Sequence, residues 1–204
     1  MNKWKQILIV LVAALLVYPF VPSTAEAQWG VGASYEIRNE APKHGFGVRI
    51  EKSIFNMIPL VDLGIRAHFS NFSEKNQLNY QYQTLSYSYS RTVQDYDYGL
   101  TAIGGVSLGL LKPYVGLGLG SNTVNIKRSD LPQTSPLEQS ATQSKIFWNA
   151  LLGAQVNLLP LLHPFVEYRY TNVGKSFFQN LEQQGIPKPS SSNGRLILGV
   201  LVRF

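Results

Sequence analysis

Hydrophobic and polar residues alternate one by one along most of the chain beyond residue 28. This period of two is typical of a β-strand, because successive side chains point to opposite faces, whereas an α-helix repeats every 3.6 residues. Eight segments show the alternation, and no segment beyond residue 28 keeps the helical period for long. They cover about residues 29–38, 45–51, 61–70, 95–106, 114–120, 147–158, 165–171 and 195–204. The pattern therefore predicts an all-β fold of eight antiparallel strands.

The two faces of these segments differ in composition. One face is apolar and carries no charged residue, as in the last segment, where Leu196, Leu198, Val200 and Val202 share a side. The other face combines many glycines with six Arg and five carboxylates. These charged residues are Glu36, Arg38, Arg49, Glu51, Asp62, Arg66, Asp97, Glu167, Arg169, Arg195 and Arg203.

The composition of the polar face indicates which side of a closed barrel it lines. A face in water usually carries Lys, Glu, Ser and Thr, and Gly weakens an exposed strand. In a narrow interior, Gly leaves room for Arg, and near-equal numbers of opposite charges allow each buried charge to find a partner. We therefore expect the charged residues to form a structural ion-pair network in the lumen and the apolar face to contact lipid.

The connections between the segments alternate in length. Three are short (about 52–60, 107–113 and 158–164), and three are longer (about 71–94, 121–145 and 172–193), with 39–44 as a brief exception on the long side. In transmembrane barrels the short turns face the periplasm and the longer loops face outward. The sequence thus predicts an up-and-down transmembrane barrel.

The long connection after the third segment alternates Tyr with Ser or Gln on both sides of Thr84-Leu85. The simpler interpretation is a hairpin that extends the third and fourth strands above the membrane, stabilised by cross-strand Tyr pairs. A second interpretation is a recognition surface, because Tyr with Ser is typical of adaptable binding surfaces. Its candidate residues are Tyr80, Tyr82, Tyr87 and Tyr89.

The first 27 residues are typical of a signal peptide. Lys3 and Lys5 precede an apolar run over 7–17, and Ala25-Glu26-Ala27 supplies a small-x-small cleavage pattern. A membrane anchor is the alternative, but the run is shorter than the roughly 20 residues of a spanning helix. We expect residues 1–27 to be removed and residues 28–204 to form one barrel domain.

Composition narrows the function classes. The chain has no Cys, its three His are far apart, and only 15% of its residues are charged. These features predict no disulfide, metal site or cofactor. The formal charge of +6 is scattered rather than clustered, so we expect no nucleic-acid partner.

The last segment, Gly194–Phe204, alternates apolar residues and ends on an aromatic one. Together with the eight segments, it resembles the small outer-membrane barrels of the OmpA, OmpX and opacity-protein type. The resemblance implies a monomer in the outer membrane of a Gram-negative cell, in contact with lipid and lipopolysaccharide. It also implies that the barrel-assembly machinery reads Phe204 as an assembly signal.

The expected function is a structural or surface-interaction (adhesin-like) scaffold with an extracellular ligand that the sequence does not name. Eight strands enclose an interior that side chains fill, which disfavours a wide channel. Two alternatives stay open. One is a small ion-permeable pore. The other is a lipid A deacylase, because His68-Phe69-Ser70-Asn71 resembles the His-x-Ser-Asn segment of those enzymes.

Overall fold

The computed structural model describes residues 29–55, 60–82, 85–131, 139–157, 161–173 and 192–204. The predicted signal peptide and its cleavage site lie outside these residues. The eight strands are β1 (Trp29–Arg38), β2 (His44–Phe55), β3 (Val61–Tyr82), β4 (Leu85–Val106), β5 (Leu111–Ser129), β6 (Ser140–Val156), β7 (Leu162–Val173) and β8 (Ser192–Arg203). No helix in the described part of the chain is long and apolar enough to cross a membrane.

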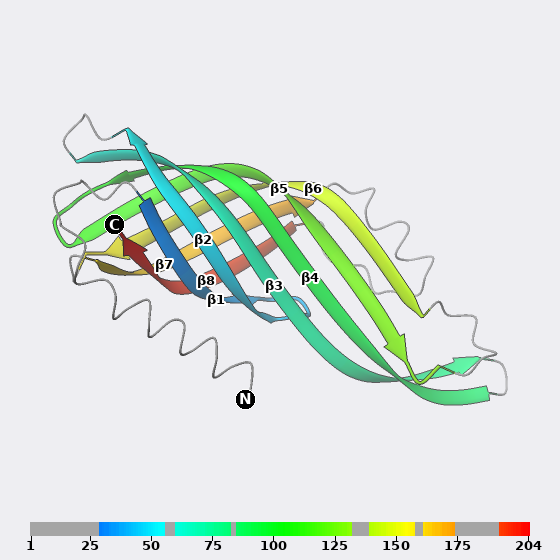
Figure 1. The fold of residues 1–204 in the computed structure, drawn as a ribbon. Helices are drawn as coiled ribbons and strands as arrows, with labels where there is room; N and C mark the ends of the chain where they lie inside the picture. Colours follow the sequence, from blue (N-terminus) through cyan, green and yellow to red (C-terminus); the bar gives the residue numbers. More distant parts are fainter. Residues whose placement is uncertain (1–28, 56–59, 83–84, 132–138, 158–160, 174–191) are drawn as a thin grey trace.

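The strands form one closed antiparallel barrel in chain order (Figure 1). β1 pairs with β8 from Gly30 opposite Arg203 to Arg38 opposite Arg195. Trp29 N–H donates to the carbonyl of Phe204 at 3.2 Å, and Phe204 N–H donates back to Trp29 at 3.0 Å. The predicted eight-stranded up-and-down barrel is confirmed.

The apolar residues of the barrel point outward. Leu100, Leu117 and Leu119 are 62%, 67% and 65% exposed. Such a face would be unfavourable in water, because exposed apolar surface costs free energy in proportion to its area. Few apolar side chains point inward, among them Ile197 and Leu201, which are fully buried.

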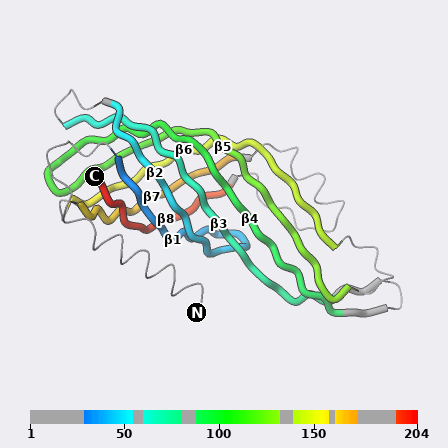
Figure 2. Tube along the Cα trace, viewed as in Figure 1, coloured from blue at the N-terminus to red at the C-terminus, as the bar shows by residue number. Residues whose placement is uncertain are grey.

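Four adjacent strands, β3 to β6, have 22, 22, 19 and 17 residues, whereas the other four have 10 to 12. They continue past the end of the barrel as one twisted sheet, which we call the extension (Figure 2). The predicted hairpin above the third and fourth strands is thus confirmed. The prediction of a loop over 121–145 was wrong at both ends, because β5 continues to Ser129 and β6 begins at Ser140.

Candidate functional site

The centre of the lumen is organised around Glu167 of β7. Its carboxylate accepts hydrogen bonds from Arg66, from Arg49 at 3.3 Å, from Arg169 at 2.9 Å and from the Tyr114 hydroxyl at 3.0 Å. Glu167 is 1% exposed. Four donors from four strands therefore surround one buried carboxylate, and the pairing offsets the cost of removing these charges from water.

A second buried carboxylate, Glu51 of β2, links this centre to the turn end of the barrel. Arg66 donates to both Glu51, at 2.9 Å, and Glu167, so it bridges the two acids. Arg203 of β8 reaches the other Glu51 oxygen at 3.1 Å. The ion pairs thus form a continuous chain across the lumen rather than separate contacts.

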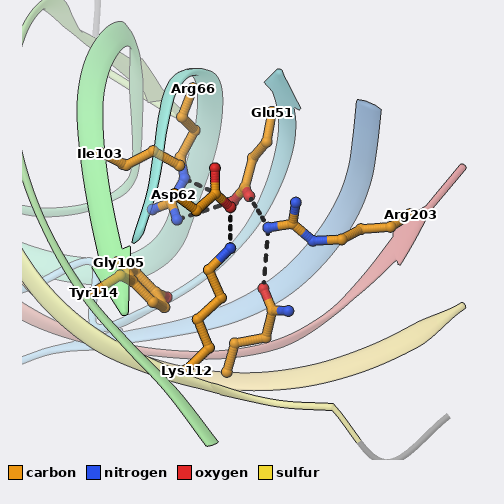
Figure 3. A pocket seen from close by; sticks show the side chains of 9 residues that line it. Glu51, Asp62, Arg66, Ile103, Gly105, Lys112, Tyr114 and Arg203 are labelled. Carbon is orange, nitrogen blue, oxygen red and sulfur yellow. Dashed lines mark hydrogen bonds and ion pairs between the residues drawn. The ribbon is translucent and has the colours of Figure 1, made fainter. Parts of the chain in front are cut away.

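A small pocket lies at the turn end, where Asp62 of β3 faces Lys112 of β5 (Figure 3). Asp62 also accepts from Ser53, and Arg203 also donates to Gln155 at 3.3 Å. The charged groups around the pocket therefore contact one another.

At the loop end, Arg195 contacts both Asp97 and Glu36, the latter at 3.2 Å. Arg38 pairs with Asp95 at 2.7 Å. The ring of Phe72 lies 4.1 Å from the Arg38 guanidinium and 5.2 Å from that of Arg195. An aromatic face against a cation adds attraction in a desolvated site. This layer closes the lumen towards the extension.

Glycine leaves the room that these charges need. A Cβ on Gly47 of β2 would overlap the carboxylate of Glu36 and the hydroxyl of Ser34. Ser34 and Ser70 both donate to Glu36, at 3.3 and 2.8 Å. Any side chain at position 47 would therefore displace this carboxylate from its partners.

The extension lies beyond the level at which β2 begins, at His44. The last pair of β2 with β3 is Gly45 opposite Phe72, and β3 then continues for ten residues, Ser73–Tyr82, paired only with β4. In the described part of the chain no strand pairs with the other edge of this segment. Among the described strands, this ten-residue segment thus has one backbone edge without a strand partner.

Residues 7–204 match the family model described as the outer membrane protein beta-barrel domain. The chain belongs to this family. It is therefore an outer-membrane protein, and the exposed apolar side chains on the outside of the barrel are typical of a surface that contacts lipid.

Solved structures show the same fold in other outer-membrane barrels. Neisserial surface protein A (NspA) is 20% identical, with a TM-score of 0.52 over 86% of this chain and 96% of that one. A major outer membrane protein from Thermus thermophilus is 13% identical, with a TM-score of 0.66 over 86% and 98%. The N-terminal barrel of Pseudomonas aeruginosa OprF is 13% identical, with a TM-score of 0.51 over 86% and 96%. No curated protein sequence matches the chain.

The structure of this outer-membrane barrel places all eleven predicted charges in or at the ends of the lumen, with Asp62 and Arg203 half-buried. It adds two charges that the sequence prediction missed, Lys112 and Asp95. Both share the inward parity of their strands, since Asp95 precedes Asp97 by two residues and Lys112 precedes Tyr114 by two. Asp95 lies at the start of the predicted segment 95–106, and Lys112 lies one alternation step before the predicted segment 114–120, so the alternation alone could have found both.

His68 and Ser70 of the His-x-Ser-Asn segment point into the lumen, whereas Phe69 and Asn71 face outward. Ser70 is fully buried and donates to Glu36, while His68 Nε2 lies 3.8 Å from Asp97. The Ser70 hydroxyl thus serves the ion-pair network and faces away from lipid. Within the described residues no group of three His, Asp or Glu could hold a metal ion.

The Tyr residues of the extension have different surroundings. Tyr80 lies directly opposite Tyr87 in the β3–β4 register. The side chains of Tyr80, Tyr82 and Tyr87 lie outside the described residues. Tyr89 lies on the inner face of β4 and is 9% exposed. A recognition role for these Tyr residues stays a prediction.

Proposed function

We propose that this outer-membrane barrel is a surface-interaction scaffold, in which a closed barrel holds the extension outside the cell. The observation that carries the proposal is the open edge of Ser73–Tyr82. Unpaired N–H and C=O groups along an edge strand are a template for an added strand, and such edges are usually kept short. A ten-residue open edge therefore favours an extended peptide segment of another protein as the partner.

The paired charges of the lumen favour a scaffold over an ion-permeable pore. Its charges pair across the barrel from Asp62 at one end to Arg38 at the other. An ion that entered would have to break contacts between buried, oppositely charged groups. The rigid barrel then serves to hold the extension.

Replacing Asn76–Arg91 by an Asn-Gly turn tests this function. Lys75 and Thr92 face each other in the register, so a two-residue turn can join them without disturbing the barrel. Phage-displayed random peptides enriched on the purified intact barrel should lose binding to this variant. Heat-modifiable gel mobility should remain unchanged, because the barrel ladder lies below the cut.

Three outcomes would favour a different function. Peptides that bind both proteins equally, or no enrichment at all, would leave a purely structural barrel. Conductance of the intact protein in planar bilayers would favour the pore. Loss of an acyl chain from lipid A upon expression, abolished by Ser70→Ala, would favour the deacylase.

We also propose that Phe204 is read by the barrel-assembly machinery. Its backbone closes the seam with Trp29, while its side chain is 50% exposed and free of that task. Phe204→Ala should therefore refold from denaturant in vitro as the parent does, yet most of it should fail to reach the outer membrane in cells. Trp29→Ala, which removes an aromatic side chain at the same seam, is the control. Equal membrane levels of the two variants would contradict the assembly role.

A further inference from the structure

A cluster of buried hydrogen-bond donors lies in the lumen, on the loop side of Glu167. Its four members point inward and are at most 3% exposed; they are Asn149 of β6, Arg169 and Thr171 of β7, and Arg195 of β8. Asn149 lies directly opposite Thr171, and Arg169 lies directly opposite Arg195. Directly opposite side chains have Cβ atoms about 5 Å apart. The four side chains therefore occupy one compact area of the lumen wall, which we call the donor cluster.

Each side chain of the donor cluster has one buried donor atom without a hydrogen-bond partner among the described residues. These atoms are Asn149 Nδ2, Arg169 Nη1, Thr171 Oγ1 and Arg195 Nε. The other side of the Asn149 amide is bonded, because its Oδ1 accepts from Thr101 at 3.4 Å. Buried donors are almost always paired, since an unpaired one is unfavourable. Four of them at neighbouring positions indicate a shared acceptor that the protein itself does not supply.

The carboxylate nearest in the fold does not fill this role. Asp97 uses Oδ2 to accept from Arg195. Its Oδ1 makes no hydrogen bond with any atom of the donor cluster and lies 3.8 Å from His68 Nε2. Glu167 accepts from Arg169 but is shared with two further Arg. The donor cluster is thus short of acceptors.

The charge of the lumen favours an anion over a neutral acceptor. Its described residues include six Arg and Lys112, against five carboxylates and Asp95, which leaves one positive charge in excess. An uncompensated charge in a closed interior is unfavourable. Arg169 and Arg195 are also directly opposite each other, an arrangement in which like charges repel. An anion between them offsets both effects.

The surroundings of the donor cluster favour a small, singly charged anion. Leu151 lies directly opposite Arg169 on β6 and is 5% exposed, and Ile197 follows Arg195 by two residues and is 1% exposed. These apolar side chains border the donors, so the site is enclosed. One negative charge matches the excess in the lumen, whereas a sulfate or phosphate dianion would exceed it. A halide ion meets both conditions.

We infer that the donor cluster binds one halide-sized monovalent anion, such as chloride, inside the lumen. Four buried donors without protein acceptors and the excess positive charge support this site. The anion accepts hydrogen bonds from β6, β7 and β8 together and so joins the last three strands of the barrel. The inference goes beyond the proposed function, which requires no ligand in the lumen.

Urea unfolding of the protein, purified from outer membranes and reconstituted in lipid vesicles, tests the site. Sodium chloride replaces sodium gluconate at constant ionic strength, so that general screening stays the same. A ligand that binds only the folded state stabilises it by mass action. Each tenfold rise in chloride above its dissociation constant should therefore raise the folding equilibrium constant about tenfold. Crystals grown in sodium bromide should show one anomalous peak within hydrogen-bond distance of Asn149 Nδ2 and Thr171 Oγ1.

The variants remove donors without touching an ion pair. Thr171→Val combined with Asn149→Leu should abolish both the chloride dependence and the bromide peak. Thr171→Val alone, which preserves volume, should raise the chloride dissociation constant about tenfold, as expected for one lost hydrogen bond to a charged group. Thr101→Val is the matched control, because Thr101 is 1% exposed and its hydroxyl faces the Asn149 oxygen. It should keep the full chloride dependence.

Two results would overturn the inference. A parent protein whose unfolding does not depend on chloride, and whose crystals show no bromide peak at the donor cluster, would assign these donors to water. An equal chloride dependence in Thr101→Val and Thr171→Val would show a general salt effect rather than a site.

Discussion

Glu167→Ala should lower the free energy of unfolding by about 3 to 5 kcal/mol, the cost of removing one partner from a buried ion-pair network. Glu167 is the shared acceptor of Arg49, Arg66 and Arg169, so its loss leaves several guanidinium groups short of a counter-charge in the lumen. The change in the free energy of unfolding can be measured in lipid vesicles by titration with the denaturant guanidinium chloride, with tryptophan fluorescence as the signal.

Arg66→Ala should produce a loss of similar size, because it removes the bridge between Glu51 and Glu167. Glu74→Ala is the matched control, since Glu74 is half-exposed on the extension and its carboxylate accepts from Asn76. Its effect should stay within about 0.5 kcal/mol, as for surface substitutions in general. Unchanged unfolding of both lumen variants would refute a stabilising, paired lumen.

The second large effect is expected on the outside of the barrel. Leu117→Arg should destabilise the protein in lipid vesicles by about 2 to 4 kcal/mol, because a cation on the lipid face near the midplane is removed from water. Leu117 is 67% exposed in the middle of the lipid-facing surface. If water contacted this face, the same substitution would have almost no effect.

Thr142→Arg provides the comparison for this variant. Thr142 is equally outward-facing but lies on the extension, above the hydrocarbon layer. Its substitution should cost little in the same vesicles. A cost for Thr142→Arg as large as that for Leu117→Arg would contradict a boundary of the lipid-facing surface below the extension.

Strand bounds were predicted correctly where the outward side chains contact lipid and are apolar while the inward side chains are charged or small. β1 was predicted with its correct bounds, Trp29–Arg38, because along it apolar residues face lipid and charged or small residues face inward. The upper halves of β5 and β6 were missed because the extension has no lipid on its outside. Thr123 and Asn125 are polar on the outside there, while Ile126 is buried on the inside, so the apolar residues change to the opposite parity.

The candidate site shows a similar limit. Alternation identified which side chains point inward, but it could not pair them, because pairing depends on barrel register and tilt. Glu167 contacts Arg49 across 118 residues of sequence and Arg66 across 101. Lys112 was assigned to the short connection over 107–113, although β5 begins at Leu111.

The span of the lumen contacts has a consequence for how the protein folds. Arg195 and Arg203 of the last strand pair with Glu36 and Glu51 of the first two, across 159 and 152 residues. Until β8 docks, those carboxylates lack part of their compensation in a membrane interior. Folding dominated by such distant contacts is slow and depends on late closure. A chain that stops before β8 would therefore expose uncompensated charge to lipid, which makes membrane insertion and completion of the barrel one concerted event.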